Sequence, residues 1–467
     1  MLNLSTLRLA TAPLLTLLLV LYSSASQAQD HTLATRIDNA IAPLFKAGEP
    51  GATIIVTKAG RPVFRKAYGM ADIARGRPMT PEALMRIASV TKQFTATAVL
   101  MLADEGKLAL DDDITRFLPD YPTGGKRITI EQLLTHTSGI ANFTSKPGFE
   151  AGVAKDMTPG QMIDTFKNDP LQFEPGTRYA YSNSGYFLLG AIIEKVSGLS
   201  YAQFVEQRIF VPLGMSNSAY DGHERGSAVR AQGYTRGNAG ASFEYGKVAS
   251  MTQPYAAGGL VSTVDDLARW DAAVSAGTLF KPASQQKALT AHILPDGKSV
   301  PYGYGWSIGK LRGMTMQSHG GGIYGYSSYA LRLPAQQLYV AVLTNADSGI
   351  PAAEMIAMKA AAIAAGNPFP EHTAITLDAK VLEAYQGSYR IDDSNTRHFR
   401  SEGGQLVMDR NGRNKVVLTA FSDTGFLIPN SVAYVEFGHD AEGAVTKVTF
   451  HGPGEPVVHA RIGALAP

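Results

Sequence analysis

The stretch Ile87-Ala88-Ser89-Val90-Thr91-Lys92-Gln93-Phe94-Thr95 opens a segment that predicts a buried helix. Residues 90–103 contain no glycine or proline, and their apolar side chains recur at helical spacing. A serine and a lysine three residues apart share one face of a helix, so the lysine amine can reach the hydroxyl and help to remove its proton. Ser89 is therefore a candidate nucleophile, and Lys92 is a candidate base.

Spacing alone is weak evidence, because Ser284-Gln285-Gln286-Lys287 repeats it; we interpret this second pair as a surface coincidence. The segments Tyr181-Ser182-Asn183 and His319-Gly320-Gly321-Gly322 give the first pair its context. Tyr181 can share the proton transfer as phenolate or relay, and Asn183 can hold Lys92 and a substrate carbonyl. The sequence leaves open whether Lys92 or Tyr181 is the main base.

The glycines that follow His319 predict a close approach of backbone to a substrate. An edge strand at this point can offer the N–H of Gly322 as one oxyanion donor, while the N–H of Ser89 offers the other. Ser89 also stands at a helix start, where the positive end of the helix dipole favours developing negative charge. Together these groups supply what hydrolysis through a serine requires.

These residues resemble the serine β-lactamase and penicillin-binding-protein-like superfamily, in the branch of class C β-lactamases, D-aminopeptidases and related esterases. The resemblance covers roughly residues 33–365 and also includes two further segments, Leu133-Leu134-Thr135-His136-Thr137-Ser138-Gly139-Ile140 and Glu174-Pro175-Gly176-Thr177-Arg178-Tyr179-Ala180-Tyr181-Ser182-Asn183-Ser184-Gly185-Tyr186. It implies that Ser89 forms the acyl-enzyme, that Lys92 and Tyr181 transfer protons, and that Asn183, His319, Gly320, Gly321 and Gly322 bind substrate. No metal or organic cofactor is implied.

The third motif departs from many β-lactamases and penicillin-binding proteins, which have Lys-Thr-Gly where this chain has His319-Gly320-Gly321. A histidine is mostly neutral at pH 7, so it binds a substrate carboxylate less well than lysine does. The departure favours a peptidase, amidase or esterase. The alternatives are a β-lactamase proper and a protein that binds cell-wall peptides or β-lactams without turnover. For His319 the alternative is a purely structural role in a strand.

Three other patterns are interpreted as structural. Gly305-Trp306-Ser307-Ile308-Gly309 matches G-x-S-x-G, but the sequence around it predicts strand and turn and not the strand-turn-helix that this motif needs. His136, two residues before Ser138, is interpreted as part of a turn after the helix that ends at Leu134. Asp111-Asp112-Asp113 lacks the glycine and distal glutamate of a calcium loop.

Length and composition predict an ordinary folded enzyme with two domains. The chain has 467 residues, a formal charge of +2 from 42 basic and 40 acidic residues, and no cysteine. The small net charge argues against nucleic acid or an anionic membrane as partner. The family resemblance implies a small molecule or short peptide as substrate. The lack of cysteine excludes disulfides and thiolate chemistry.

The N-terminus predicts export. Arg8, an apolar stretch over residues 10–22 and small residues before Ala28 follow the order of a secretory signal, with cleavage expected after Ala28. An uncleaved anchor is the alternative. We expect a secreted or periplasmic protein without stable membrane insertion after cleavage.

The order of elements predicts an α+β catalytic domain over residues 29–371, in which an antiparallel sheet is flanked by helices and accompanied by a helical subdomain. Glycine and proline at 366–370 indicate a linker, and residues 372–467 predict a small antiparallel β-barrel similar to the lipocalin-like domain of some relatives. The expected helices are 32–48, 90–103, 129–134, 159–168, 185–196, 201–210, 264–275 and 351–365; the expected strands are 52–57, 63–68, 304–308, 314–317, 324–333, 338–344, 385–391, 405–409, 416–420, 425–428, 433–437 and 445–451.

Overall fold

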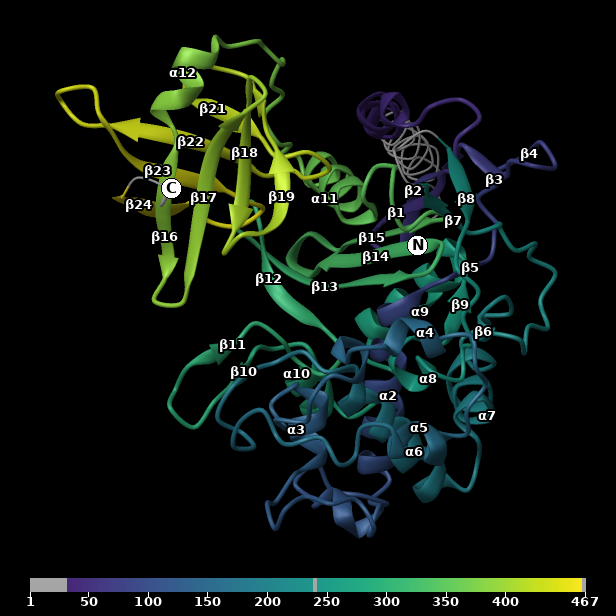
Figure 1. Ribbon diagram of the computed structural model, residues 1–467. Helices are drawn as coiled ribbons and strands as arrows, with labels where there is room; N and C mark the ends of the chain where they lie inside the picture. The colour runs from purple at the N-terminus through teal and green to yellow at the C-terminus, as the bar shows by residue number, and fades with distance from the viewer. Residues whose placement is uncertain (1–31, 238–241, 464–467) are drawn as a thin grey trace, which may run out of the picture.

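The computed structural model describes residues 32–237 and 242–463. The signal sequence predicted at residues 1–28 lies outside this part of the chain. A mixed helix and sheet domain carries the three motifs, and a nine-stranded antiparallel barrel lies beside it (Figure 1). Within the described residues, no helix has both the length and the apolar character needed to cross a bilayer.

The central sheet of the first domain has six antiparallel strands in the order β12-β13-β14-β15-β1-β2. The two strands nearest the N-terminus therefore complete a sheet whose other four strands lie within residues 307–344, as the sequence predicts. Ala52 pairs with Thr344 at the junction of β1 and β15. The strands are β1 (Ala52–Lys58), β2 (Arg61–Tyr68), β12 (Ser307–Leu311), β13 (Met314–Ile323), β14 (Tyr326–Leu333) and β15 (Leu338–Thr344).

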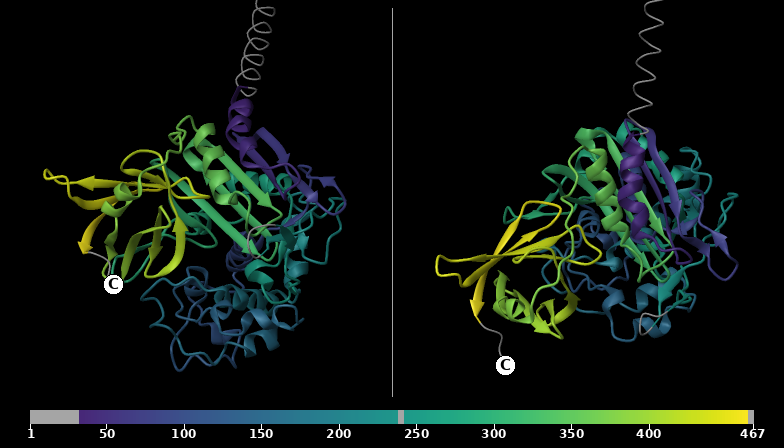
Figure 2. Two further views of the ribbon diagram at one scale, coloured as in Figure 1. Left: turned by 45° about the horizontal axis from the view of Figure 1, so that its top comes forward. Right: turned by 90° about the horizontal axis from the view of Figure 1, so that it is seen from above.

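Helices cover both faces of this sheet because alternate strand residues are apolar on both sides. Ile54 and Val56 of β1 pack with α11 (Ala353–Ala364) and with the helix at residues 32–41, as Figure 2 shows from above. Ile55 of the same strand faces the opposite core, which contains α2 (Thr91–Asp104) and α9 (Val264–Ala276). The sheet is thus a buried layer, as a period of two with apolar residues in both registers requires.

Helix α2 runs through the interior of the helical region, where several of its polar side chains find hydrogen-bond partners. The hydroxyl of Thr95 donates to Ala256 O at 2.6 Å, and Gln93 accepts a hydrogen bond from the indole of Trp270 at 3.0 Å. The other helices of this region are α3 (Ile130–Leu134), α4 (Phe149–Gly152), α5 (Pro159–Asp164), α6 (Asn183–Ser197), α7 (Tyr201–Val205), α8 (Tyr255–Gly258) and α10 (Pro282–Ala288).

Short strands complete this domain. β5 (Met85–Arg86), β9 (Leu260–Ser262) and β6 (Ala219–Tyr220) form a small sheet below the central one. Three two-stranded sheets consist of β3 (Met70–Asp72) with β4 (Arg77–Pro78), β7 (Tyr234–Arg236) with β8 (Phe243–Tyr245), and β10 (His292–Ile293) with β11 (Ser299–Val300).

The C-terminal sheet follows the order β19-β18-β17-β16-β24-β23-β22-β21-β20 and is nearly closed. Its interior is filled by side chains, among them Tyr389, Phe399 and Phe437. A short helix, α12 (Ala379–Ala384), precedes it. The strands are β16 (Gly387–Asp392), β17 (Asn395–Glu402), β18 (Gln405–Arg410), β19 (Arg413–Val417), β20 (Thr419–Ala420), β21 (Gly425–Leu427), β22 (Tyr434–His439), β23 (Val445–His451) and β24 (Val457–Gly463). The domain boundary at residue 372 stays a prediction.

Several predicted bounds are wrong. The strand expected to end at Gln317 continues as β13 to Ile323, because the glycine run keeps an extended conformation while it pairs with β14. The helix expected over 159–168 ends at Asp164, and the one over 201–210 changes to π geometry at Glu206. The strands β17 and β24 were not predicted.

Candidate active site

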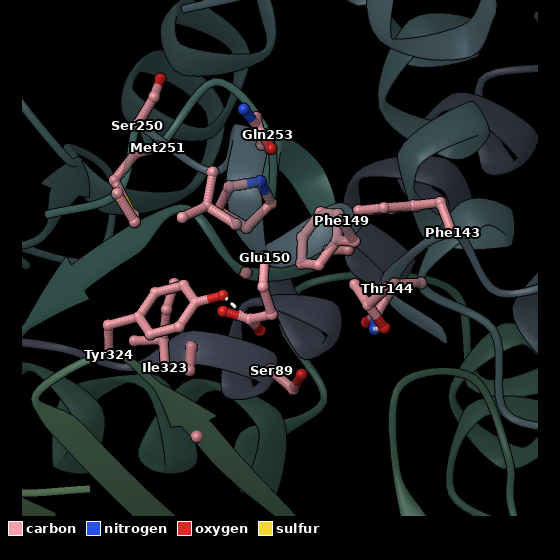
Figure 3. A pocket seen from close by; sticks show the side chains of 18 residues that line it. Ser89, Phe143, Thr144, Phe149, Glu150, Ser250, Met251, Gln253, Ile323 and Tyr324 are labelled. Atoms are coloured by element: carbon pink, nitrogen blue, oxygen red, sulfur yellow. Dashed lines mark hydrogen bonds between the residues drawn. The ribbon is translucent and has the colours of Figure 1, made fainter. Parts of the chain in front are cut away.

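Ser89 stands in a tight turn that leads directly into α2. The turn is the 3₁₀ segment η2 (Ala88–Val90), and Ala88 has a positive φ of 44°, a conformation that non-glycine residues adopt only at a cost. Ser89 is half-buried and lies at the wall of a cavity, where Figure 3 shows its hydroxyl group. The strained turn thus presents the hydroxyl to the cavity at the N-terminal end of a buried helix.

Lys92 lies one turn further along and makes three polar contacts. Its Nζ is 3.0 Å from the Oγ of Ser89, 2.8 Å from the Oδ1 of Asn183 and 2.7 Å from the carbonyl oxygen of Ala257. The side chain is fully buried, and burial lowers the pKa of Lys92 well below its usual value. The described residues place no carboxylate within ion-pair distance of its amine. The site therefore favours an uncharged amine in contact with a serine hydroxyl.

Tyr181 lies just before α6 and Asn183 lies at its start, and both side chains reach Lys92. Asn183 is the first residue of that helix, and its side chain also donates to the hydroxyl of Thr144 at 3.3 Å. The ring of Tyr181 lies 4.9 Å from the Nζ of Lys92. Burial raises the pKa of Tyr181, and a hydrogen bond with Ser89 lowers it by less, so the phenol is protonated at neutral pH.

His319 lies in β13, and both its ring nitrogens are occupied. Its Nε2 is 2.8 Å from the hydroxyl of Tyr302, and its Nδ1 is 2.7 Å from the carbonyl oxygen of Gly320. Burial lowers the pKa of His319 to about 3. The side chain is therefore neutral and does not line the cavity.

The glycine run brings β13 against the turn that carries Ser89. A Cβ atom on Gly321 would lie 2.5 Å from the carbonyl oxygen of Ile87 and 2.9 Å from the amide nitrogen of Ser89. Residues 319–323 also extend past the end of β12, which pairs with β13 only from Met314 to Ser318. Gly320 pairs with Tyr329 of β14 on the inner side, and the exposed Gly322 lines the same cavity as Ser89.

The cavity has a volume of about 300 Å³. Apart from Ser89 and Asn183, its walls come mainly from a short 3₁₀ helix, from α4, from the segment before α8 and from the end of β13: Phe143, Thr144, Phe149, Glu150, Val153, Ser250, Met251, Gln253, Gly322, Ile323 and Tyr324. Glu150 is the one acidic or basic side chain among these described lining residues, and it points toward Tyr324 above Ser89 (Figure 3). Its Oε1 accepts a hydrogen bond from the Tyr324 hydroxyl at 2.7 Å, and its Oε2 lies 2.9 Å from the Nζ of Lys247. The cavity thus has a carboxylate at its mouth.

The structure separates the alternative motifs from this cavity. Ser284 donates to a carboxylate oxygen of Asp104 at 2.7 Å, and Lys287 is exposed, so this pair lacks the burial that Lys92 has. Ser307 opens strand β12, where it pairs with Ser318, and no helix follows it.

Four residues near the site escaped the sequence analysis as functional candidates: Ala257, Tyr302 and Glu150 were not singled out, and His136 was interpreted only as a turn residue. Ala257 contributes its backbone, which no side-chain motif signals. Tyr302 lies between β11 and β12 and Glu150 lies in the short helix α4, and neither stands in a recognisable motif; only the folded chain brings them near the site. His136 stands in a segment that carried the family resemblance, and that was the available signal.

Comparison with known proteins agrees with this geometry. The family model described as Beta-lactamase matches residues 37–365. Penicillin-binding protein 4* of Bacillus subtilis (strain 168) is 30% identical over 417 residues, which cover 83% of this chain and 90% of that protein. A D-aminopeptidase of Gluconobacter oxydans (strain 621H) is 30% identical over 353 residues, which cover 73% of this chain and 64% of that enzyme.

Solved structures show the same likeness over both domains. The octameric penicillin-binding protein homologue from Pyrococcus abyssi matches with a TM-score of 0.65 and 28% identity, and the match covers 92% of this chain and 99% of that chain. Since the family model spans residues 37–365, and the curated relatives include an enzyme of the same fold, the chain belongs to the beta-lactamase family of serine hydrolases.

Proposed function

We propose that the protein hydrolyses an amide or ester bond through an acyl-enzyme on Ser89. The observation that carries this proposal is the set of three contacts made by the buried amine of Lys92. A neutral amine has two N–H donors and one lone pair. The two donors match Asn183 Oδ1 and Ala257 O, which leaves the lone pair for the hydroxyl proton of Ser89.

In the first half-reaction the Oγ of Ser89 attacks the substrate carbonyl as its proton passes to Lys92. A carbon–oxygen bond forms, and the oxyanion is held by the N–H groups of Ser89 and Gly322. The bond to the leaving group then breaks, and the leaving group takes the proton from Lys92 through the hydroxyl of Tyr181. Because Tyr181 is protonated at neutral pH, it serves as a relay and Lys92 as the base.

In the second half-reaction a water molecule enters the place that the leaving group has left. Lys92 takes one proton from this water while the water oxygen attacks the acyl carbon, and the ester bond to Ser89 breaks. The proton returns to the Oγ of Ser89, which restores the free enzyme and releases the acid product. Asn183 keeps the amine in place throughout, and His319 supports the strand that carries Gly322.

The cavity supports an acyl group that carries a free ammonium. The carboxylate of Glu150 faces the cavity. Hydrogen bonds from Lys247 and Tyr324 lower the pKa of Glu150, so the carboxylate is charged at neutral pH. His319 offers no charge and no free ring nitrogen to a substrate carboxylate. A similar D-aminopeptidase agrees with this preference. We therefore propose amino-acid amides and short peptides with a free amino end as the substrate class, ahead of β-lactams.

The test combines labelling with a substrate panel. The wild-type protein and Ser89→Ala are treated with a fluorophosphonate probe and assayed with p-nitrophenyl esters, D- and L-amino acid amides, D-Ala-D-Ala peptides and nitrocefin. We expect labelling and turnover by the wild type only. Undiminished labelling and turnover by Ser89→Ala would overturn the proposal, and a stable acyl adduct without product, seen by intact mass, would identify a binding protein.

We also propose that the protein is exported to the periplasm or secreted, on the pattern of residues 1–28. Expression with a C-terminal tag, cell fractionation and N-terminal sequencing test this. A mature chain that begins at Gln29 is expected, and an intact cytoplasmic chain would contradict it.

A further inference from the structure

His136 contacts Tyr181 and the two residues beside it. Its carbonyl oxygen accepts the N–H of Ala180 at 2.9 Å, and its Nδ1 accepts the N–H of Ser182 at 3.1 Å. Its ring lies 4.3 Å from the ring of Tyr181, between centroids. The backbone N–H groups of the residues on either side of Tyr181, and its aromatic ring, are therefore all contacted by one residue.

The segment that carries Tyr181 has little other support. Residues 170–182 form no helix or strand, and they dock on the turn after α3 through backbone bonds. Gln172 N–H donates to Gly139 O at 2.8 Å, and Gly176 N–H donates to Thr137 O at 2.7 Å. At the end of the segment nearest Ser89, His136 supplies both acceptors. One of these acceptors, Nδ1, belongs to the side chain, so the His136 side chain helps to set the position of the Tyr181 phenol.

The chemistry of His136 suits this task. The side chain is 1% exposed, and burial lowers the pKa of His136 well below its usual value. Because Nδ1 accepts a hydrogen bond, the proton of the neutral ring is on Nε2, which has no hydrogen-bond partner among the described residues. Burying an N–H without a partner costs free energy, so His136 carries a cost to stability at this position.

The ring of His136 also joins two of the motifs. It lies 4.6 Å from the ring of Tyr302, whose hydroxyl is hydrogen-bonded to His319. His136 itself has a positive φ of 58°, which directs its ring back toward the Tyr181 segment. The imidazole of His136 therefore contacts both Tyr181, the tyrosine beside Ser89, and Tyr302, which is hydrogen-bonded to the histidine of the third motif.

We infer that His136 is a positioning residue for Tyr181, which keeps the phenol oriented for proton transfer to the leaving group. The inference rests on the proposed function, in which Tyr181 acts as the relay. It predicts that a substitution at His136 lowers the turnover of amides, whose leaving group needs a proton, more than the turnover of p-nitrophenyl esters, whose leaving group departs without one.

The test uses His136→Leu, which removes the acceptor, and His136→Asn, whose Oδ1 can replace Nδ1 and which tolerates positive φ. We expect His136→Leu to lower kcat for an amino acid anilide roughly 100-fold, to change KM little and to affect the p-nitrophenyl ester about tenfold less. His136→Asn should recover most of the anilide activity. Thermal unfolding of both variants shows whether each is folded.

A double-mutant cycle with Tyr181→Phe decides between positioning and general support. With the phenol absent, His136→Leu should reduce the remaining anilide activity less than about threefold. An equal loss on ester and anilide, or a full loss again in the Tyr181→Phe background, would overturn the positioning role alone. Undiminished turnover by Ser89→Ala would instead overturn the proposed function and this inference with it.

Discussion

Gly321 passes the nucleophile turn so closely that a Cβ atom on it would lie 2.9 Å from the amide nitrogen of Ser89. The same Cβ would meet backbone at Ile87 O, which cannot move aside as a flexible side chain can. We expect Gly321→Ala to shift the turn and to lower kcat/KM for a p-nitrophenyl ester by roughly 100-fold, because the N–H of Ser89 leaves its oxyanion position.

Gly309→Ala is the matched control, since a Cβ on Gly309 in β12 meets only the tip of Met316 at 3.9 Å. It should keep wild-type activity. Full activity in Gly321→Ala would show that the turn and β13 do not act as one rigid unit.

Lys92 predicts a pH dependence of stability. Its pKa is lowered in the folded protein, so the unfolded chain binds more protons at any pH between the lowered value and about 10.4. Stability that depends on Lys92 therefore rises with pH across this window, with a slope of at most about 1.4 kcal/mol per pH unit. Urea unfolding of the wild type and Lys92→Met at pH 7, 8 and 9 measures the difference in slope. Parallel pH curves would mean that Lys92 is charged in the folded state.

Glu150 predicts a preference for substrates with a free ammonium. Glu150→Gln keeps the shape and a hydrogen-bond acceptor for Tyr324 but removes the negative charge. We expect it to lower kcat/KM for an amino acid anilide relative to the N-acetylated anilide by about tenfold, with the change mainly in KM.

Glu174→Gln is the control for Glu150, because Glu174 is exposed, pairs with Lys126 and does not line the cavity. Its ratio of the two activities should match the wild type. If Glu150→Gln changes both substrates equally, the Glu150–Tyr324 bond only holds the loop, and the ammonium site is wrong.

The barrel interior predicts a local loss of stability. Phe437 packs against Tyr385 at 4.3 Å and Phe399 at 5.0 Å, between ring centroids. Truncation to Phe437→Ala should destabilise the barrel by about 3–5 kcal/mol through lost contacts and an internal cavity. Val417→Ala, at an exposed site, should cost less than about 0.5 kcal/mol.

Chemical denaturation followed by fluorophosphonate labelling separates the two domains. We expect Phe437→Ala to unfold the barrel at lower urea while Ser89 stays reactive. Simultaneous loss of labelling would show that the barrel supports the catalytic domain.

Helix α2 could be predicted from the sequence because its residues lack glycine and proline and are apolar, so local helix propensity and burial agree. In the barrel, local propensity and burial disagree. Strand β24 exposes Val457 and Val458 and buries His459, so its hydrophobic pattern points the wrong way. Its pairing with β16 and β23 makes it a strand, and such non-local pairing has no local signal.

By itself the sequence determined which residues are candidates and in what order they occur: Ser89 with Lys92, then Tyr181 with Asn183, then the glycines after His319. The tertiary structure alone decided their chemistry. The amine of Lys92 donates a hydrogen bond to the carbonyl oxygen of Ala257, 165 residues away along the chain, and its burial favours the uncharged form. A pKa depends on burial and on non-local partners, which spacing along the chain cannot specify. For the same reason the sequence predicted only a turn at His136, and the contact between its ring and Tyr181 is visible only in the folded chain.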